Sequence, residues 1–337
     1  MAGVNQKIDK DDYNAIQTVV QSVLGTGSGT FGYGQPVLSS ARTTSDPITV
    51  NEYAALRYDI INAYKHLNNA LPPDVDTQTV GAKVRYDVAP PDAAPINYWL
   101  SVANSISTNR QALAVAGQRQ TVNHGTVNFS SPWGSSAPVG STPQLTCIVD
   151  VEWPTSEQAR HFFNTGSSLQ FTSSRTGGST TAQNTSWTTL LSTAGTRIFG
   201  GNTPGTGTTP ADGQNWFRLT NVGQTWSSVS ASSPYALNEW IITAQTNDTP
   251  TAITNNSAGS SRSLRFFVYW IDNHFPLGGD AATGTPTQPS LGFGPDTVDG
   301  TVSLTVQTVK ASGVLEPVGS GNFEVTTPTV VVNAITN

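Results

Sequence analysis

The carboxylates Asp150 and Glu152 are the strongest candidates for chemistry in this sequence. They lie in Val149-Asp-Val-Glu-Trp153, which has the pattern of a β-strand, and residues i and i+2 of a strand point to the same face. Paired carboxyl groups on one face are what glycoside hydrolysis requires. Solvent-facing charges, a salt bridge or a calcium contact are commoner uses of such a pair. Hydrolysis of a polysaccharide is therefore an alternative here rather than the main expectation.

The other reactive side chains do not form a recognisable catalytic or metal-binding pattern. The four histidines are scattered, with no H-E-x-x-H motif or closely spaced ligand set; they are His66, His124, His161 and His274. His161, next to Phe162 and Phe163, is expected to be structural. The single cysteine, Cys147, has apolar neighbours typical of a buried residue, and no G-x-S-x-G nucleophile motif occurs. The sequence therefore predicts no enzyme, no metal site and no cofactor.

Two glycine-containing segments have the residue types of ligand loops. Gly27, Gly29 and Gly32 match G-x-G-x-x-G, which binds dinucleotides when a strand precedes it and a helix follows. Here the pattern indicates a helix before the glycines and an extended segment after them, so we expect a tightly packed loop. Asp299-Gly300 lacks the spacing of an EF-hand, and an ordinary Asp-Gly turn is expected there.

The elements that carry these residues contain few charges. Asp, Glu, Lys and Arg make up 11% of the 337 residues, against roughly 25% in an average soluble domain, and Ser, Thr, Asn, Gln and Gly take their place. The net charge is −6 and no Lys/Arg run is longer than a pair, so nucleic acid is not an expected partner. No apolar stretch approaches 18 residues and no apolar segment follows the first residues, so neither membrane insertion nor signal-peptide export is expected. A weakly hydrated surface favours packing against other copies or against sugars.

The first third of the chain has the periodicity of two or three amphipathic helices. Asp9 is the predicted N-cap of the first helix, which should end at Gly25 in the left-handed conformation. Thr49 and Glu52 predict a capping box for the second helix, and a third is expected over about 94–116. The second helix carries an apolar seam at 3,4 spacing, formed by Tyr53, Leu56, Ile60 and Leu67. Short helices bury little alone, so we expect this seam to dock on the other helices or on neighbouring subunits.

From about Thr121 the pattern changes to strands, so the fold class is α+β. Strands are expected at 121–129, 144–153, 168–174, 216–221, 225–230, 239–245, 263–271, 301–310 and 323–332, with short helices at 155–164 and 184–193. We predict a helical anchoring and assembly region over 1–117, and a mainly antiparallel, β-sandwich-like domain with short helical insertions over 118–337. Most tryptophans of such a domain fill its core, but exposed ones provide stacking faces for sugars. The candidates for glycan contact are Trp187, Trp216, Trp226 and Trp240.

Two stretches, about a quarter of the chain, resemble virion structural proteins of tailed phages, especially contractile-tailed phages of marine cyanobacteria. One runs from Lys7-Ile-Asp-Lys-Asp-Asp-Tyr to Val23-Leu-Gly-Thr-Gly-Ser-Gly-Thr-Phe-Gly-Tyr-Gly-Gln35. The other joins Arg160-His-Phe-Phe-Asn-Thr-Gly166, Asn184-Thr-Ser-Trp-Thr-Thr-Leu-Leu191 and Ile198-Phe-Gly-Gly201. The resemblance implies a component of the phage particle and carries no catalytic residues.

Composition and resemblance together lead to one functional expectation with three alternatives. We expect a non-enzymatic structural protein of the virion, associated with tail, neck or fibre, which assembles with copies of itself and other virion proteins in the host cytoplasm. A capsid decoration protein is the first alternative. The second is a carbohydrate-binding adhesion module that contacts host surface glycans, and the third is the polysaccharide hydrolase that uses Asp150 and Glu152.

Overall fold

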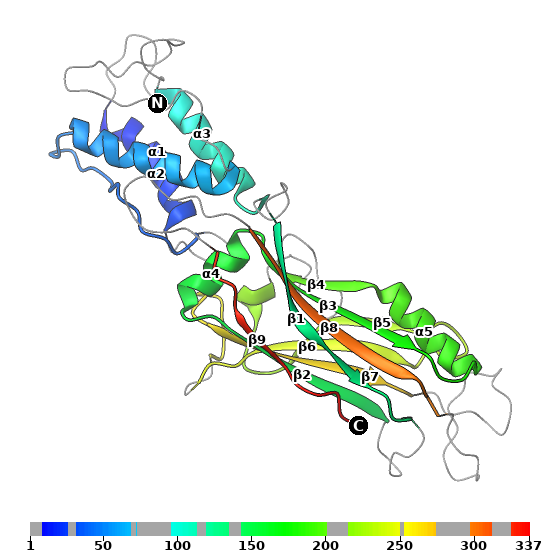
Figure 1. The fold of residues 1–337 in the computed structure, drawn as a ribbon. Helices are drawn as coiled ribbons and strands as arrows, with labels where there is room; N and C mark the ends of the chain where they lie inside the picture. The colour runs from blue at the N-terminus through cyan, green and yellow to red at the C-terminus, as the bar shows by residue number, and fades with distance from the viewer. Residues whose placement is uncertain are drawn as a thin grey trace. The chain divides into compact units, whose positions relative to one another are not determined.

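The α+β class is confirmed: helices come first, and two antiparallel sheets follow (Figure 1). A computed structural model describes residues 9–25, 32–68, 72, 96–112, 119–134, 143–200, 215–249, 253–273, 297–311 and 325–337. These residues form two compact units. The helical unit draws on Met1–Gln120, Thr155–Ser167 and Lys310–Thr327, and the β-rich unit on Thr121–Pro154, Ser168–Val309 and Pro328–Asn337.

Helix α1 (Lys10–Leu24) begins where the sequence predicts. The side chain of Asp9 accepts from the backbone N–H of Asp12, whose own carboxylate accepts from the N–H of Asp9, so the two form a capping box. The left-handed end at Gly25 is wrong, because this residue has φ −67°. Glycine is needed there for space: a Cβ atom on Gly25 would lie 2.8 Å from the carbonyl oxygen of Gln21.

Helices α2 (Val50–Asn68) and α3 (Ile96–Asn109) complete a three-helix core. The carboxylate of Glu52 accepts from the N–H of Thr49 at 3.0 Å, as expected for the predicted capping box. The third helix ends at Asn109, seven residues before its predicted end at 116, and residues 113–118 lie outside the described part of the chain. All three helices contact one another, so each buries its apolar face against the other two.

Helix α4 (Ser156–Asn164) belongs to the helical unit although it lies between two strands in the sequence. The hydroxyl of Thr155 caps it by accepting from the N–H of Gln158, and the side-chain amide of Asn164 donates to the carbonyl of Gly32 at 2.6 Å. The chain first leaves the helical unit after residue 120, close to the predicted boundary at 117. Because later segments return to that unit, a single boundary does not describe the organisation.

The described residues of the β-rich unit form two antiparallel sheets, of four and five strands. The first has the order β1 (Arg119–Phe129), β8 (Thr301–Ala311), β3 (Ser168–Thr176), β4 (Thr196–Gly200); the second has the order β5 (Gln224–Ser230), β6 (Glu239–Thr246), β7 (Ser263–Ile271), β2 (Gln144–Glu152), β9 (Thr329–Val332). The strand predicted at 216–221 is wrong, because residues 215–218 form the short 3₁₀ helix η2 (Asn215–Arg218).

Aromatic side chains fill the space between the inner faces of the two sheets. The ring of Phe266 on β7 lies 4.9 Å from that of Phe171 and 5.0 Å from that of Phe199, measured between centroids. The indole N–H of Trp270 donates to the hydroxyl of Ser173 at 2.9 Å, which joins β7 to β3. Burial of such large apolar groups is the main stabilising contribution to a sandwich of this kind.

Candidate functional site

Strand β2 places the carboxylates Asp150 and Glu152 on one face, as its alternation requires, but arginines of the β7 region pair with both. Asp150 lies opposite Arg265 in the register and accepts from its Nε and Nη2 atoms at 2.7 and 3.0 Å. Glu152 lies 3.1 Å from the guanidinium of Arg262. Carboxylates held in this way serve as cross-strand pairs, and this geometry favours the salt-bridge interpretation over hydrolysis.

Replacing Asp150 by asparagine should lower the free energy of unfolding by about 0.5–1 kcal/mol, because a partly exposed ion pair contributes little. Urea unfolding would measure the change. The control is Glu152→Gln, which removes the more exposed of the two pairs and should have a smaller effect. Cleavage of a polysaccharide by the parent protein but not by Asp150→Asn would restore the hydrolase interpretation.

His66 of α2 and His161 of α4 meet in the interior of the helical unit. Their Nε2 atoms lie 2.9 Å apart, so one ring donates and the other accepts. The ring of Tyr33 lies 5.2 Å from that of His66 and 5.7 Å from that of His161, and its hydroxyl donates to the carbonyl of Arg110 at 2.6 Å. The pair, 95 residues apart in sequence, therefore ties α4 to α2.

Burial keeps both imidazoles neutral. His66 and His161 are 3% and 1% exposed. Loss of hydration lowers the pKa of His66 to about 4. Burial, and then the repulsion that a protonated His66 would exert, holds the pKa of His161 well below its usual range. A neutral pair enclosed by protein suits the structural role expected for His161, and its consequence is a dependence of stability on pH.

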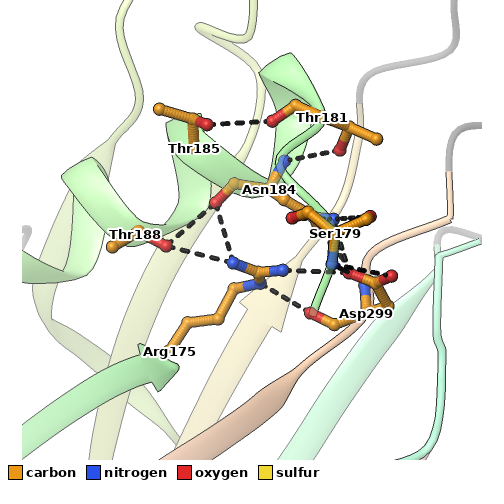
Figure 2. Close-up of polar contacts among 7 residues, drawn as sticks. All are labelled: Arg175, Ser179, Thr181, Asn184, Thr185, Thr188 and Asp299. Carbon is orange, nitrogen blue, oxygen red and sulfur yellow. Dashed lines mark hydrogen bonds and ion pairs between the residues drawn. The ribbon is translucent and has the colours of Figure 1, made fainter. Parts of the chain in front are cut away.

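Figure 2 shows a polar network around Arg175 and Asp299 in the β-rich unit. The guanidinium of Arg175 donates to the backbone carbonyl of Asp299 at 2.6 Å and to its carboxylate at 3.0 Å, and also to the carbonyl of Asn184 at 3.2 Å and the hydroxyl of Thr188 at 3.1 Å. The same carboxylate accepts from the backbone N–H of Ser179 at 3.0 Å. Hydrogen bonds from Ser179, and then the neighbouring Asn184 and Arg175, lower the pKa of Asp299.

This network fixes three segments that are distant in sequence. The side-chain amide of Asn184 donates to the carboxylate of Asp299 at 2.5 Å, and its oxygen accepts from the N–H of the same residue at 3.2 Å. Helix α5 (Ala182–Ala194) is thereby held against the turn before β8. A Cβ atom on Gly178 would lie 2.4 Å from the carboxylate, so only glycine fits beside it. Because an arginine already supplies the cation, the Asp-Gly turn anchors α5 and is not an open calcium site.

The helical seam docks on the other helices, the first of its two predicted partners, because its side chains form the interior of the helical unit; docking on a neighbouring subunit is wrong. Leu56 and Ile60 have no exposed surface, and the other two seam residues are buried as well; the four are Tyr53, Leu56, Ile60 and Leu67. Tyr53 contacts the ring of Tyr13 on α1 at 5.9 Å and that of Trp99 on α3 at 6.2 Å. A side chain that is already covered by its own chain has no surface to offer a neighbouring subunit.

The predicted glycan contacts are wrong for the same reason. All four tryptophan side chains are at most 1% exposed; they are Trp187, Trp216, Trp226 and Trp240. The ring of Trp226 packs against Phe199 at 5.3 Å, and that of Trp187 against Trp133 at 5.1 Å. Stacking on a sugar needs an accessible ring face, so these residues serve the core.

The outer face of the four-stranded sheet carries a feature that the sequence did not reveal. Four threonines line up across all four strands: Thr126, Thr305, Thr172 and Thr196. The first two hydroxyls lie 2.8 Å apart, Thr305 is opposite Thr172 in the register, and the hydroxyls of Thr172 and Thr196 again lie 2.8 Å apart. We call this alignment the threonine row.

Uncharged polar side chains continue on both sides of the threonine row. The hydroxyl of Ser303 donates to the side-chain oxygen of Asn128 at 2.7 Å and lies opposite Ser174. On the other side, Gln307 lies opposite Gln170. These residues and the threonine row together form the hydroxyl face, which carries no charge. The hydroxyl face therefore contains part of the serine, threonine, asparagine and glutamine residues that replace charged residues in this chain.

Comparisons with protein-family models, with curated proteins and with solved structures found no match for this chain. What the structure defines is therefore an α+β protein with a helical unit and an antiparallel, sandwich-like β-rich unit. Among the described residues, no helix combines the length and the apolar character needed to cross a membrane. Within the same residues, no three His, Cys, Asp or Glu side chains gather as metal ligands would.

Proposed function

We propose that this chain is a non-enzymatic structural component of a tailed-phage virion, associated with its tail, neck or fibre. The first support is the resemblance of its amino-terminal segment and of the segments around α4, α5 and β4 to virion proteins of this kind. Two compact units, one helical and one β-rich, suit a projecting part better than a capsid decoration protein, which stays the alternative.

The observation that carries the proposal is the hydroxyl face. Dehydrating an uncharged side chain is much less unfavourable than dehydrating an ion, and a face without charge produces no repulsion when two copies approach. Its side chains already bond to one another between β1 and β8 and between β3 and β4, which leaves fewer unpaired groups in a contact. The hydroxyl face replaces the helical seam as the surface through which we expect assembly.

The fate of the candidate catalytic groups also supports a non-enzymatic role. Asp150 and Glu152 pair with arginines, Asp299 anchors α5, and the imidazoles of His66 and His161 bond to each other in the interior. Each of these groups has a structural use in the fold, so none of them needs a reaction to explain its presence.

Thr126→Lys tests the proposal, because it places one charge on the hydroxyl face at an exposed position of the edge strand β1. We expect incorporation into purified particles to fall about tenfold, since an unpaired charge opposes close packing. Immunoblotting of particles against a capsid standard measures incorporation. The control is Thr329→Lys, which makes the same change at an exposed position of the edge strand β9 in the other sheet.

Two results would contradict the proposal at different levels. Equal incorporation of both lysine variants would remove the hydroxyl face as the assembly surface. Particles can be labelled with antibody to the parent chain and viewed by electron microscopy. If no label binds them, the proposed virion role is wrong.

A further inference from the structure

A groove of about 420 Å³ lies in the β-rich unit, between one face of α5 and the segment Ser230–Tyr235. Leu190, Pro234 and Tyr235 provide its apolar contacts, and Thr185, Thr189 and Ser230 are among the hydroxyl-bearing residues that line it. The side chains of Leu190 and Tyr235 are buried, whereas Thr185 and Thr189 are exposed. The groove therefore combines an apolar base with an accessible polar rim.

The lining of this groove contains only alanine, leucine, proline, tyrosine, serine and threonine. No lining residue is charged, so a charged ligand would lose hydration there without an ion pair to the groove wall, which is unfavourable. A purely apolar ligand would leave the rim hydroxyls without partners. The composition of the walls thus selects for a neutral molecule that has both apolar and hydroxyl-bearing surfaces.

The hydrogen bonds that the rim hydroxyls already make determine whether the ligand must donate or accept hydrogen bonds. The hydroxyl of Thr185 donates to the carbonyl of Thr181 at 2.9 Å, and that of Thr189 donates to the carbonyl of Thr185 at 2.9 Å. The hydroxyl of Ser230 donates to the carboxylate of Glu239 at 3.1 Å. Because a hydroxyl has one proton and two acceptor lone pairs, these three groups are left as acceptors. A matching ligand must bring several donors.

We propose that this groove binds a neutral saccharide. Sugar hydroxyls supply the donors that Thr185, Thr189 and Ser230 require, and the C–H face of a pyranose ring fits against Leu190 and Pro234. The volume lies within the range of small-ligand pockets and accommodates one or two sugar rings. The proposal goes beyond the virion role and concerns different residues from the hydroxyl face.

The test uses the full chain and saturation-transfer NMR with glucose, galactose, N-acetylglucosamine, maltose and cellobiose, and with glucuronate and sialic acid as charged counterparts. We expect transfer to at least one neutral sugar and none to the charged pair. Thr189→Arg, which puts a long cationic side chain into the groove, should weaken binding about tenfold or more, equivalent to about 1.4 kcal/mol. The matched control is Ser192→Arg, on an exposed position of the same helix outside the groove, and should bind within about twofold of the parent.

Thr189→Val serves as a second variant, because it keeps the shape of the side chain and removes only the hydroxyl. A measurable loss of affinity with an unchanged thermal midpoint would support recognition by that oxygen. Failure of all five neutral sugars to show transfer at about 20 mM, above the weakest affinities usual for specific ligands, would overturn the proposal. Binding that Thr189→Arg leaves unchanged, or equal binding of the charged sugars, would overturn it too.

Discussion

Lowering the pH from 7 to 4 should destabilise the helical unit by about 3 kcal/mol through His66 alone, since its pKa falls from 6.5 to about 4 on folding. Above pH 6.5 the imidazole is neutral in both states and contributes nothing. Between pH 6.5 and 4 the imidazole of His66 is protonated in the unfolded chain but not in the folded chain, so the free energy of unfolding falls. The lowered pKa of His161 acts in the same direction. Urea unfolding followed by the helical circular dichroism signal at several pH values measures the loss.

The window from pH 6.5 to 5 separates the buried histidines from most carboxylates, which titrate below it; besides His66 and His161, the lowered pKa of His124 in the β-rich unit also acts there. Asp59, whose pKa burial raises, has the opposite sign: its folded form binds a proton more readily, so its contribution increases stability as the pH falls. His66→Gln is the control, because glutamine keeps a neutral hydrogen-bonding group and has no titration. The slope of stability against pH in this window should be shallower in the variant. Equal slopes would show that His66 does not govern acid sensitivity.

Replacing Leu56 by alanine should lower the free energy of unfolding of the helical unit by about 2–5 kcal/mol, because a fully buried leucine leaves both lost apolar contact and a cavity. Leu56 lies with Ile60, Tyr13 and Trp99 in the core shared by α1, α2 and α3. The helical circular dichroism signal during urea unfolding is again the measurement. A leucine that served only to dock a neighbouring subunit would give a far smaller change in the isolated protein.

The matched control is Leu38→Ala, in the same unit, where the side chain is 42% exposed. The substitution keeps the backbone N–H that donates to Asp59 at 3.0 Å, so a change below about 1 kcal/mol is expected. Similar losses for Leu56→Ala and Leu38→Ala would contradict the assignment of the helical seam to the core.

Local signals were sufficient to predict most of the elements. Capping residues mark the starts of α1, α2 and α4, because the bonds between Asp9 and Asp12 or between Thr49 and Glu52 involve neighbours three residues apart. A run that is apolar on both faces over part of its length marks β7, whose predicted bounds coincide with the observed ones. The five-residue strand β4 was missed because it is too short to show a pattern.

The functional candidates were predicted less well, since exposure depends on the whole fold. Periodicity places Leu56 and Ile60 on one face of a helix, but α1 and α3 decide that this face is covered. A tryptophan such as Trp240 gives no local sign of whether a second sheet lies over it. The threonine row and the histidine pair join residues about 25 to 180 positions apart, and such pairings arise from the topology of the chain.

Helix α4 has a consequence for how the chain is made. Its residues are synthesised after β2, yet it supplies His161 to the interior formed by the first helices, and β2 in turn lacks an outer neighbour until residues 329–332 emerge. Because the helical unit also takes in Lys310–Thr327 and the β-rich unit Pro328–Asn337, neither unit can be completed on the ribosome before most of the chain has left the exit tunnel. Domains usually fold as units in the order of translation; here the two finish late, and a shortened chain would leave both incomplete.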